Sequence, residues 1–565
     1  MQFFGRQLFP NRRKPETANR KPIFSDWPFL LGLGLVGLVL FFYRLGVPPL
    51  MDPDEGRYAE IAREMLVLKD WIVPHLNLLP YLEKPPLVYW LTALSFKVLG
   101  YTEAAARLAA AAGALGGLFL AYGLGRVLWG PGAGVLSALA AATCAGYVAL
   151  GRILTLDMTF SLLLNLGIGL GFLALSRERP RLWPWAYLAL ALAVLTKGPV
   201  ALVLAGLVWG IWVLFPGGES GLRSWRALVQ PWSWLLLAAL TLPWFIAVQW
   251  RYPEFFRFFV LEQHFGRFLT PAIHPEPLYY YGPVLLGLLL PWTWLLPWAL
   301  AVNGWRRDPE ARFLVIWAAV IVIFFSLSRG KLVPYILPAL LPLALILGRA
   351  LTRLTGVGRL SFNSRFLKTS LLIWGGAGVA LVALSVWAPA PLSQALGRAN
   401  LASPYLLTVA AVWTLTPLAA LLRRHLGALM LGALLLAALL PLGIEQVAPA
   451  RSFKTMGLAL ESRWRPGDAL VGVQLYSQGL SFYSGQVFHL LGCRTELDFG
   501  ERLAPESGLC LPNKAALPAF AAAHPVTFFF LKADDVNWLK EGLRGKFTRV
   551  AAHKDCILLA YEGKL

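Results

Sequence analysis

The sequence predicts a polytopic α-helical membrane protein that carries a small α/β domain at its C-terminal end. Of its 565 residues, 57% are hydrophobic and 14% are charged, whereas a soluble domain carries roughly 25% charged residues. About fourteen apolar segments approach the ~20 residues that a spanning helix needs. From about Gln446 onward, the pattern changes to short strand-like and helix-like segments.

Basic residues set the orientation of the apolar segments, because cytoplasmic loops of membrane proteins collect Lys and Arg. Residues 1–21 are basic and polar without a signal-peptide cleavage pattern, so we expect a cytoplasmic tail ahead of a signal-anchor helix. Since the basic residues lie mainly between apolar runs, the net charge of +21 does not indicate a nucleic-acid ligand. The other basic clusters expected in the cytoplasm are 177–179, 306–307, 349–368 and 423–424.

One early apolar segment is not expected to cross the membrane. With the N-terminus inside, the basic clusters fit only if such a segment exists, and 86–99 is short, follows a proline and contains Lys97. We expect it to be a re-entrant or interfacial helix, which leaves about 13 crossings. The apolar segments begin near Trp27, Pro86, Ala104, Ala133, Thr159, Trp183, Pro199, Trp232, Tyr279, Ala311, Leu332, Leu371, Tyr405 and Gly427.

This topology places three polar loops, 51–90, 151–158 and 251–278, on the outer face together with the C-terminal region. Ionisable residues from distant parts of the sequence then share one side of the membrane. Such a convergence suits an active site.

We expect a membrane domain at 1–445, with a catalytic loop at 47–90, and a periplasmic α/β domain at 446–565. The four cysteines show no CxxC spacing, which argues against a zinc cluster. Cys493 and Cys510 could form a disulfide in a periplasmic domain, and free buried thiols are the alternative. The expected strands of this domain are 469–475, 527–531 and 556–561, and the expected helices are 515–523 and 534–543.

The first outer loop begins with three carboxylates, Asp52, Asp54 and Glu55. Apolar residues recur at helical spacing over 54–68, which predicts an amphipathic helix on the membrane surface. Asp52 or Asp54 is expected to cap this helix by accepting hydrogen bonds from its free backbone N–H groups. Two adjacent acids are more than a cap requires, so Asp54 and Glu55 are also candidates for chemistry.

The same loop ends in YLEKPP (81–86), which places Glu83 and Lys84 where an apolar segment begins. Burial of either charge there is unfavourable without a partner or ligand. Lys84 is either a phosphate ligand or an interfacial lysine whose ammonium group reaches the water.

The other outer loops add further candidates. Asp157, between two spanning segments, is either a functional acid or a helix cap. Lys197 and Lys331 lie at outward helix ends, where they could bind an anionic headgroup. His264 could form a divalent-metal site with Glu83, although a lone histidine is usually structural.

The first loop resembles that of a known enzyme family. Its segments DEGRYAEIAREM (54–65) and YLEKPPLVYW (81–90) resemble the bacterial 4-amino-4-deoxy-L-arabinose transferases. These are GT-C membrane glycosyltransferases, a superfamily that includes the protein O-mannosyltransferases. The motifs match closely in the first loop. The rest of the chain matches in its order of elements only, with about 13 helices before a periplasmic α/β domain.

The resemblance implies an inverting transferase that moves a monosaccharide from undecaprenyl phosphate to lipid A or another envelope acceptor. It implies a multi-pass protein of the bacterial inner membrane, with catalytic roles for Asp54 and Asp157. Glu83 and His264 match a pair that can hold a structural zinc ion, with no cofactor required for transfer. From the pattern and the resemblance together, the expected substrate-binding residues are Arg57, Tyr58, Tyr81, Lys84, Lys197, Arg267, Lys331 and Tyr335.

The chemistry of the residues agrees with such a reaction. A lipid phosphate is already a stable anion, so the leaving group needs cationic stabilisation from Lys84 and neighbouring Arg rather than a strong acid. Asp54 can act as general base on an acceptor hydroxyl, or orient an acceptor phosphate. Asp52-Pro-Asp54 also matches the metal-binding DxD pattern, but by coincidence, because a monophosphate donor needs no such metal.

Two rival functions remain open. An O-mannosyltransferase-like enzyme would act on protein Ser/Thr or on another glycan. A lipid-linked-sugar flippase is the alternative of a different class, but transporters favour broken helices that meet near the bilayer midplane. For either function, we expect the protein to be a monomer surrounded by membrane lipids.

Overall fold

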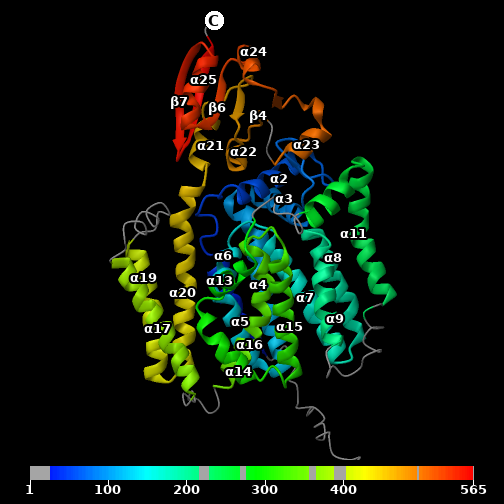
Figure 1. The fold of residues 1–565 in the computed structure, drawn as a ribbon, viewed down its shortest axis with the longest axis vertical. Coiled ribbons are helices and arrows are strands. Elements are labelled where there is room, and N and C mark those ends of the chain that lie inside the picture. The colour runs from blue at the N-terminus through cyan, green and yellow to red at the C-terminus, as the bar shows by residue number, and fades with distance from the viewer. Residues whose placement is uncertain are drawn as a thin grey trace, which may run out of the picture.

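The computed structural model describes residues 26–214, 228, 230–266, 275–354, 364–386, 403–492 and 496–563, apart from the side chains of His264 and Phe265. A helix bundle forms one end of the molecule and a sheet domain forms the other (Figure 1). Helices α2 (Asp54–Leu68) and α3 (Leu87–Leu99) lie between them. The first outer loop therefore lies at the junction of the two parts.

The bundle is built mainly from apolar helices that run along the long axis of the molecule (Figure 1). The elements that precede the sheet domain, besides α2 and α3, are α1 (Trp27–Gly37), η2 (Leu38–Phe42), β1 (His75–Leu76), β2 (Leu79–Pro80), α4 (Glu103–Trp129), α5 (Pro131–Ala142), α6 (Ala145–Leu150), α7 (Asp157–Ser176), η3 (Pro180–Leu182), α8 (Trp183–Lys197), α9 (Val200–Leu214), α11 (Pro231–Arg251), η4 (Arg257–Gly266), η5 (Leu278–Tyr280), α13 (Tyr281–Leu288), η6 (Trp292–Leu295), α14 (Leu296–Asn303), α15 (Pro309–Leu327), η7 (Val333–Ala339), α16 (Leu340–Thr352), α17 (Arg365–Val386), α19 (Ser403–Arg423), α20 (Leu426–Val447) and η9 (Ala448–Arg451).

Eight of the described helices are long and apolar enough to cross a membrane. A pair bent by 103°, 278–288 with 292–303, would make a ninth span. Each of the fourteen expected apolar segments begins inside a helix of the structure or just before one, which confirms a multi-pass membrane protein. Several of these helices are shorter than a full span, so the expected number of 13 crossings stays a prediction.

Helix α3 has 13 residues, which at about 1.5 Å per residue is too short for a hydrocarbon core of ~30 Å. It lies beside α2 at the upper end of the bundle (Figure 1). Its outer face exposes Leu91, Leu94 and Val98. This geometry agrees with the interfacial helix expected at 86–99.

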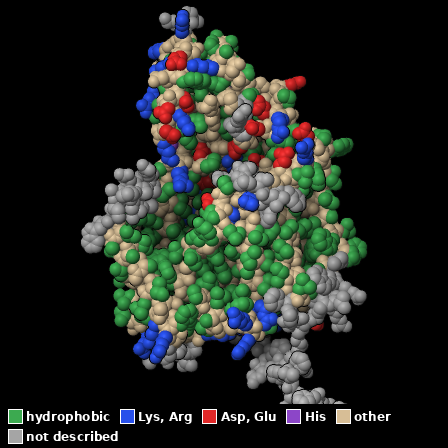
Figure 2. Space-filling view, in the orientation of Figure 1, with side chains coloured by type: hydrophobic (Ala, Val, Ile, Leu, Met, Phe, Trp, Pro, Cys, Tyr) green, Lys and Arg blue, Asp and Glu red, His purple; other side chains and the backbone are tan. Residues whose placement is uncertain are grey.

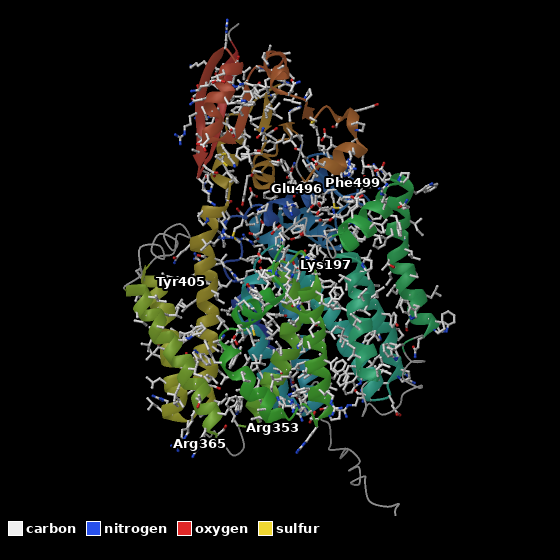
Figure 3. The ribbon with its side chains drawn as sticks, viewed as in Figure 1. Lys197, Arg353, Arg365, Tyr405, Glu496 and Phe499 are labelled. Atoms are coloured by element: carbon white, nitrogen blue, oxygen red, sulfur yellow. The ribbon has the colours of Figure 1, made fainter. Side chains whose placement is uncertain are left out.

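The two ends of the bundle differ in charge. Lys and Arg side chains gather at the end opposite the sheet domain (Figure 2). Arg353 and Arg365, from the basic loop expected in the cytoplasm, lie at this end (Figure 3). Apolar side chains cover the sides of the bundle between the two ends (Figure 2).

The C-terminal domain is a six-stranded mixed sheet with the order β5-β4-β3-β6-β8-β7. The first four strands in that order pair in parallel, and β8 pairs antiparallel with both β6 and β7. The expected strands at 469–475, 527–531 and 556–561 are confirmed. The elements are α21 (Lys454–Glu461), β3 (Ala469–Val473), α22 (Gln478–Ser484), β4 (Phe488–Leu491), α23 (Asp498–Leu503), η10 (Pro505–Ser507), β5 (Cys510–Leu511), η11 (Lys514–Ala516), α24 (Leu517–Ala522), β6 (Thr527–Lys532), η12 (Ala533–Asp535), α25 (Val536–Gly542), β7 (Gly545–His553) and β8 (Cys556–Gly563).

The cysteines of the chain differ in state. Cys510 is disulfide-bonded, whereas Cys144 and Cys556 are free buried thiols. The expected partner of Cys510, Cys493, lies outside the described residues. The disulfide is therefore part of the C-terminal domain rather than of the bundle.

One face of the sheet shares its hydrophobic core with the first outer loop. A single cluster of buried side chains joins Ile61 and Met65 of α2 to Phe528 and Phe530 of β6. The amphipathic helix expected at 54–68 is confirmed in its bounds. Its polar residues Glu60 and Glu64 are nevertheless buried. They lie close to Leu78 of the same loop and to Tyr476 of the C-terminal domain.

Candidate active site

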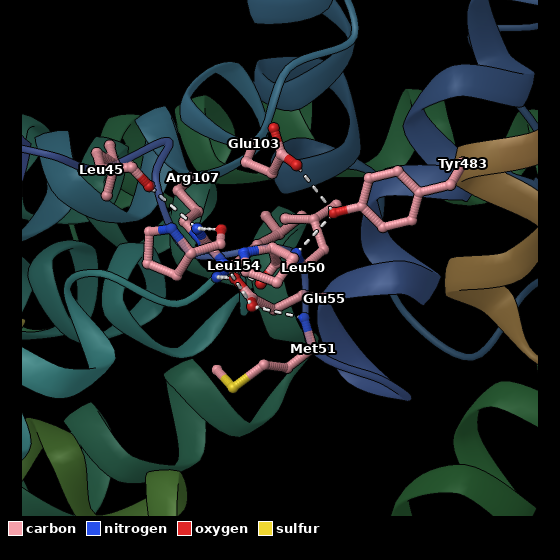
Figure 4. A network of polar contacts seen from close by, with 10 residues as sticks. Leu45, Leu50, Met51, Glu55, Glu103, Arg107, Leu154 and Tyr483 are labelled. Atoms are coloured by element: carbon pink, nitrogen blue, oxygen red, sulfur yellow. Dashed lines mark hydrogen bonds and ion pairs between the residues drawn. The ribbon is translucent and has the colours of Figure 1, made fainter. Parts of the chain in front are cut away.

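Two adjacent carboxylates at the start of α2 have different surroundings. The Glu55 carboxylate lies 2.7 Å from Nε and 2.8 Å from Nη2 of Arg107, and accepts a hydrogen bond of 2.8 Å from the Leu154 N–H. The side chains of Glu55 and Arg107 are each 1% exposed. This buried ion pair holds the first outer loop against α4 (Figure 4).

The same network reaches the C-terminal domain. The Tyr483 hydroxyl of α22 accepts a hydrogen bond of 2.7 Å from the Leu50 N–H and lies 3.1 Å from the Glu103 carboxylate (Figure 4). The Arg107 guanidinium also donates to the carbonyl oxygens of residues 45, 48 and 49. The segment before α2 is therefore fixed from two directions.

Asp54 faces the more open side of the loop. Its side chain is 58% exposed, and Oδ1 lies 3.2 Å from Nη1 of Arg57. The N-cap residue of α2 is Pro53, and no side chain caps the helix. The expected cap by Asp52 or Asp54 is therefore wrong, because Asp52 accepts its hydrogen bonds from the C-terminal domain instead.

The Arg57 guanidinium lies between carboxylates from different parts of the chain. Its Nη2 lies 2.7 Å from Oε2 of Glu496, in the loop that follows β4, while Nη1 faces Asp54. Burial raises the pKa of Glu496, and the charge of Arg57 and a hydrogen bond from the Gln478 amide oppose that rise. The C-terminal domain thus contributes a carboxylate to the candidate site.

Tyr58 and Tyr81, both expected in the substrate pocket, are buried near Arg57. Burial raises the pKa of Tyr81, and the carboxylate of Glu83 raises it further. The ring of Tyr58 lies 5.8 Å from that of Tyr89, and burial raises the pKa of Tyr58 as well. Both phenols therefore stay protonated at neutral pH and can donate hydrogen bonds to a sugar or phosphate oxygen.

A second acid–base centre lies at the ends of α7 and α8 that face the first loop. Lys197 Nζ donates a hydrogen bond to Asp157 Oδ1, and the side chains of the two residues are 10% and 11% exposed. The same Nζ lies 4.3 Å from the ring centroid of Tyr335 and 5.3 Å from that of Phe160. The structure therefore brings together three of the predicted site residues, Asp157, Lys197 and Tyr335.

Helix geometry favours both charges of this pair. Asp157 occupies the first turn of α7 and Lys197 the last turn of α8, which complements the dipole of each helix. The N-cap residue of α7 is Leu156, with no side-chain cap, so the alternative role of Asp157 as a cap is wrong.

Tyr58 connects the two centres. Burial is the main cause of its raised pKa, and the carboxylates of Asp54 and Asp157 both add to the rise. Lys197 lies at the upper end of the bundle, and Glu496 lies just above it in the C-terminal domain (Figure 3). The acids and bases of the two centres therefore gather where the helix bundle meets the C-terminal domain (Figure 3).

Glu83 and Lys84 lie half-buried in the turn before α3, and both have polar or charged partners. Burial raises the pKa of the Tyr81 and Tyr89 hydroxyl groups, and the negative charge of Glu83 raises both further. The turn therefore borders the cluster of Tyr81 and Tyr89.

The remaining predicted residues lie elsewhere or are not described. Lys331 Nζ donates hydrogen bonds to the carbonyl oxygens of Ser328 and Glu276, at 2.5 and 2.8 Å. Arg267 and the side chain of His264 lie outside the described residues. Among the described residues, no group of three or more His, Cys, Asp or Glu could hold a metal ion. The pair of Glu83 and His264 therefore stays a prediction.

Sequence reasoning missed three residues of this region, Glu496, Gln478 and Tyr89. Tyr89 lies within the recognised segment 81–90, so its position in that segment was a usable signal. Glu496 and Gln478 lie in a domain without a recognisable motif, and only the fold brings them to Arg57.

Comparison with known proteins identifies relatives of this chain. A family model described as dolichyl-phosphate-mannose-protein mannosyltransferase matches residues 83–250. A Pseudomonas aeruginosa protein named undecaprenyl phosphate-alpha-4-amino-4-deoxy-L-arabinose arabinosyl transferase is 37% identical over 375 residues, 64% of this chain and 65% of that protein. An Edwardsiella ictaluri protein of the same name is 33% identical over 366 residues, 62% of this chain and 65% of that protein. The chain thus spans a little under two thirds of the length of these relatives.

The crystal structure of ArnT from Cupriavidus metallidurans bound to undecaprenyl phosphate matches the chain with a TM-score of 0.83 and 28% identity, over 94% of this chain and 98% of that one. The chain has the GT-C fold. The apo form of the same protein gives a TM-score of 0.82 and 27% identity. The expected GT-C fold and the resemblance to the 4-amino-4-deoxy-L-arabinose transferases are thereby confirmed, and the match covers the bundle and the sheet domain together.

Proposed function

We propose that the chain is an inverting glycosyltransferase of the bacterial inner membrane. It transfers a monosaccharide, 4-amino-4-deoxy-L-arabinose, from undecaprenyl phosphate to lipid A or another envelope acceptor on the periplasmic side. One observation carries the proposal: the acids and bases of the Asp54–Arg57 and Asp157–Lys197 centres gather at one end of a GT-C bundle. The relatives named for this transfer, and the ArnT structure with its bound undecaprenyl phosphate, support the choice of donor.

In the proposed reaction, basic residues stabilise the leaving phosphate and tyrosine hydroxyl groups donate hydrogen bonds to the donor. Breaking the bond between the sugar and the lipid phosphate builds negative charge on the phosphate, which Lys84 and Arg57 stabilise. The phenols of Tyr58 and Tyr81 donate hydrogen bonds to the sugar or the phosphate. Lys197, held by Asp157 and stacked over an aromatic ring, supplies a further cation for the donor.

Asp54 acts on the acceptor. Its exposed carboxylate lies at the open side of the loop, where it can take the proton of an attacking hydroxyl. General-base catalysis of this kind contributes roughly 10²–10⁴-fold to a rate. For an acceptor phosphate, which is already anionic, Asp54 orients the acceptor or stabilises positive charge on the sugar. Glu83 and His264 are the residues that would hold a structural zinc ion, and no step of the transfer passes through it.

The proposed topology has 13 crossings, with the active site, the catalytic loop 47–90 and the domain 446–565 in the periplasm. The basic end of the bundle opposite the sheet domain supports this orientation. The disulfide of Cys510 supports it as well, because disulfides persist in the periplasm and are rare in the cytosol. The protein acts as a monomer surrounded by membrane lipids.

A protein O-mannosyltransferase-like activity is the second candidate, and the family match at 83–250 favours it. Both enzymes would use a polyprenyl-linked sugar, so the acceptor distinguishes them. A flippase is disfavoured, because the candidate residues lie at one end of the bundle rather than midway along it.

The deciding experiment measures the product in cells and the turnover in vitro. Lipid A and surface glycans are compared by mass spectrometry with and without this gene, and one added aminopentose on lipid A is the expected result. Purified protein with the Asp54→Asn substitution should lose at least 10²-fold in turnover while its unfolding temperature stays unchanged.

A matched control uses an acid outside the site. Glu461 of α21 is exposed, and Glu461→Gln removes one carboxylate from the outer part of the molecule without touching either centre. It should retain full turnover. Normal turnover by Asp54→Asn would remove this carboxylate from the mechanism, and a hexose on a protein would favour the second candidate.

A further inference from the structure

Asp52 binds the C-terminal region with three hydrogen bonds. Its backbone N–H donates to the carbonyl oxygen of Arg451 at 2.9 Å. Its carboxylate accepts from the Ser477 hydroxyl at 2.6 Å and from the Gly479 N–H at 2.8 Å. Ser477 is the N-cap residue of α22 and Gly479 lies in its first turn, so one residue of the first loop fixes the start of this helix.

The backbones of α2 and α22 meet beside Asp52. A Cβ atom added to Gly56 would lie 2.5 Å from the backbone nitrogen of Gly479, and one added to Gly479 would collide with the Asp52 carboxylate. Two facing glycines therefore allow the approach that brings the Gly479 N–H within reach of Asp52. Side chains at either position would push the two elements apart.

Asp54 lies between two anchored acids of the same turn. Glu55 fixes the inner side of the turn through Arg107 of the bundle. Asp52 fixes the outer side through α22 of the C-terminal domain. The carboxylate of Asp54 pairs with Arg57 at the open side of the loop, and its backbone lies between the two anchored residues, so both anchors help to set its position.

We propose that the C-terminal domain positions the catalytic carboxylate of Asp54 through Asp52, which makes Asp52 a positioning residue for the transfer reaction. This inference rests on the proposed function, in which Asp54 acts on the acceptor. It assigns a task to α22, which holds one end of the catalytic turn while the bundle holds the other. Misplacement of a reacting group by about 1 Å can lower a rate by about 10²-fold.

The test compares three variants in the purified full-length protein. Asp52→Ala removes both side-chain anchors and should lower kcat by about 10- to 100-fold with little change in the KM for undecaprenyl-phosphate aminoarabinose. Asp52→Asn keeps an acceptor for the Gly479 N–H and can donate to Ser477, so it should recover most of the lost kcat. Ser477→Ala removes one anchor and should lower kcat by a few-fold.

Asn77→Ala is the control for a purely structural effect. The Asn77 side chain exchanges two hydrogen bonds with the backbone of Phe488, at 2.8 and 2.9 Å, so it also joins the loop to the C-terminal domain, but away from Asp54. This variant should lower the unfolding temperature and leave kcat unchanged. An equal loss of kcat in Asn77→Ala and Asp52→Ala would overturn the inference.

Two further outcomes separate this inference from the proposed function. Normal kcat in Asp52→Ala, with an active wild-type protein and an inactive Asp54→Asn variant, overturns the positioning role alone. Absence of transfer by the wild-type protein overturns the proposed function itself. If Asp52→Ala fails to fold, the kcat values of Ser477→Ala and Asp52→Asn provide the test. A 10- to 100-fold loss of kcat in Asp52→Asn would assign the effect to the charge of Asp52 rather than to its position, and would overturn the inference.

Discussion

Among the buried acid–base pairs of the described residues, Glu55–Arg107 and Asp157–Lys197 make similar contacts but differ in what those contacts leave open. Glu55 and Arg107 saturate one another, and the remaining hydrogen-bonding capacity is taken by backbone groups. Lys197 donates to Asp157, but it also lies over the faces of two aromatic rings. The first pair is closed within the protein, whereas the second has a cation that a ligand could approach along an aromatic surface.

This difference teaches how to read charges buried in a membrane protein. An ionisable residue at such a site is a candidate for function by default, and Glu55 and Asp157 were both candidates from sequence. The contacts distinguish them, because a carboxylate that is saturated by guanidinium and backbone donors has no capacity left for a substrate. We therefore expect the Glu55 pair to serve stability, and we propose that the Asp157 pair serves the reaction.

Removal of Arg107 should have the largest effect of all on stability. Arg107→Met leaves the buried Glu55 carboxylate without its cation, and breaking a buried pair in this way costs about 3–5 kcal/mol. We expect poor membrane expression and a strongly lowered unfolding temperature in detergent. The double variant with Glu55→Gln should recover part of the loss, since no uncompensated charge remains. A single variant as stable as the wild type would contradict the structural role.

Removal of Lys197 should show the opposite pattern. Lys197→Ala is expected to lower kcat/KM by about 10²-fold, equivalent to about 2.7 kcal/mol, because the donor loses a cation at its phosphate or sugar. The unfolding temperature should fall less than in Arg107→Met, since Asp157 lies at a helix N-terminus that partly offsets the loss of its cation. Kinetics and thermal unfolding of the same preparation provide the check. A stability loss without a kinetic effect would place this pair with the first one.

The sequence predicted those features that depend on local pattern. Each apolar segment was found because hydrophobic runs mark helices directly, and α2 was placed at 54–68 by its periodicity. The acids of the first loop were recognised by an unbroken local motif. Asp157 was chosen from its place between two spanning segments and Lys197 from its place at an outward helix end, and only the fold shows that they are partners.

Features that depend on contacts between distant segments were not predictable in the same way. Strands β4 and β5 have four and two residues, too few for a pattern to stand out. The carboxylate of Glu496 reaches Arg57 only because the sheet domain packs on α2. The polar face of α2 was expected at the membrane surface, and its burial is tolerated because Glu60 pairs with Arg63 of the same helix.

Glu64, on this covered face of α2, gives the smallest effect that we expect to measure. Burial raises the pKa of its carboxyl group well above the usual value, and the nearby charge of Glu60 raises it further, while the Leu78 N–H and Arg63 oppose the rise. Between the pKa of the unfolded chain and that of the folded protein, Glu64 therefore keeps its proton when folded and releases it when unfolded. The stability that this proton confers is complete below about pH 4 and is lost as the pH rises through the folded pKa.

Glu64→Gln should therefore stabilise the protein at pH 7.5, by about 1 kcal/mol, and should have no such effect near pH 4. The glutamine keeps an oxygen that accepts the Leu78 N–H hydrogen bond, which is 2.9 Å long in the wild type, and its amide can donate to Glu60. Thermal unfolding in detergent between pH 4 and pH 8 measures both predictions on one variant. Glu55→Gln is the matched substitution, and it should destabilise at every pH, because Glu55 is paired with Arg107. If Glu64→Gln destabilised the protein at pH 7.5, Glu64 would be ionised in the folded protein. It would then be a paired carboxylate that contributes stability, like Glu55.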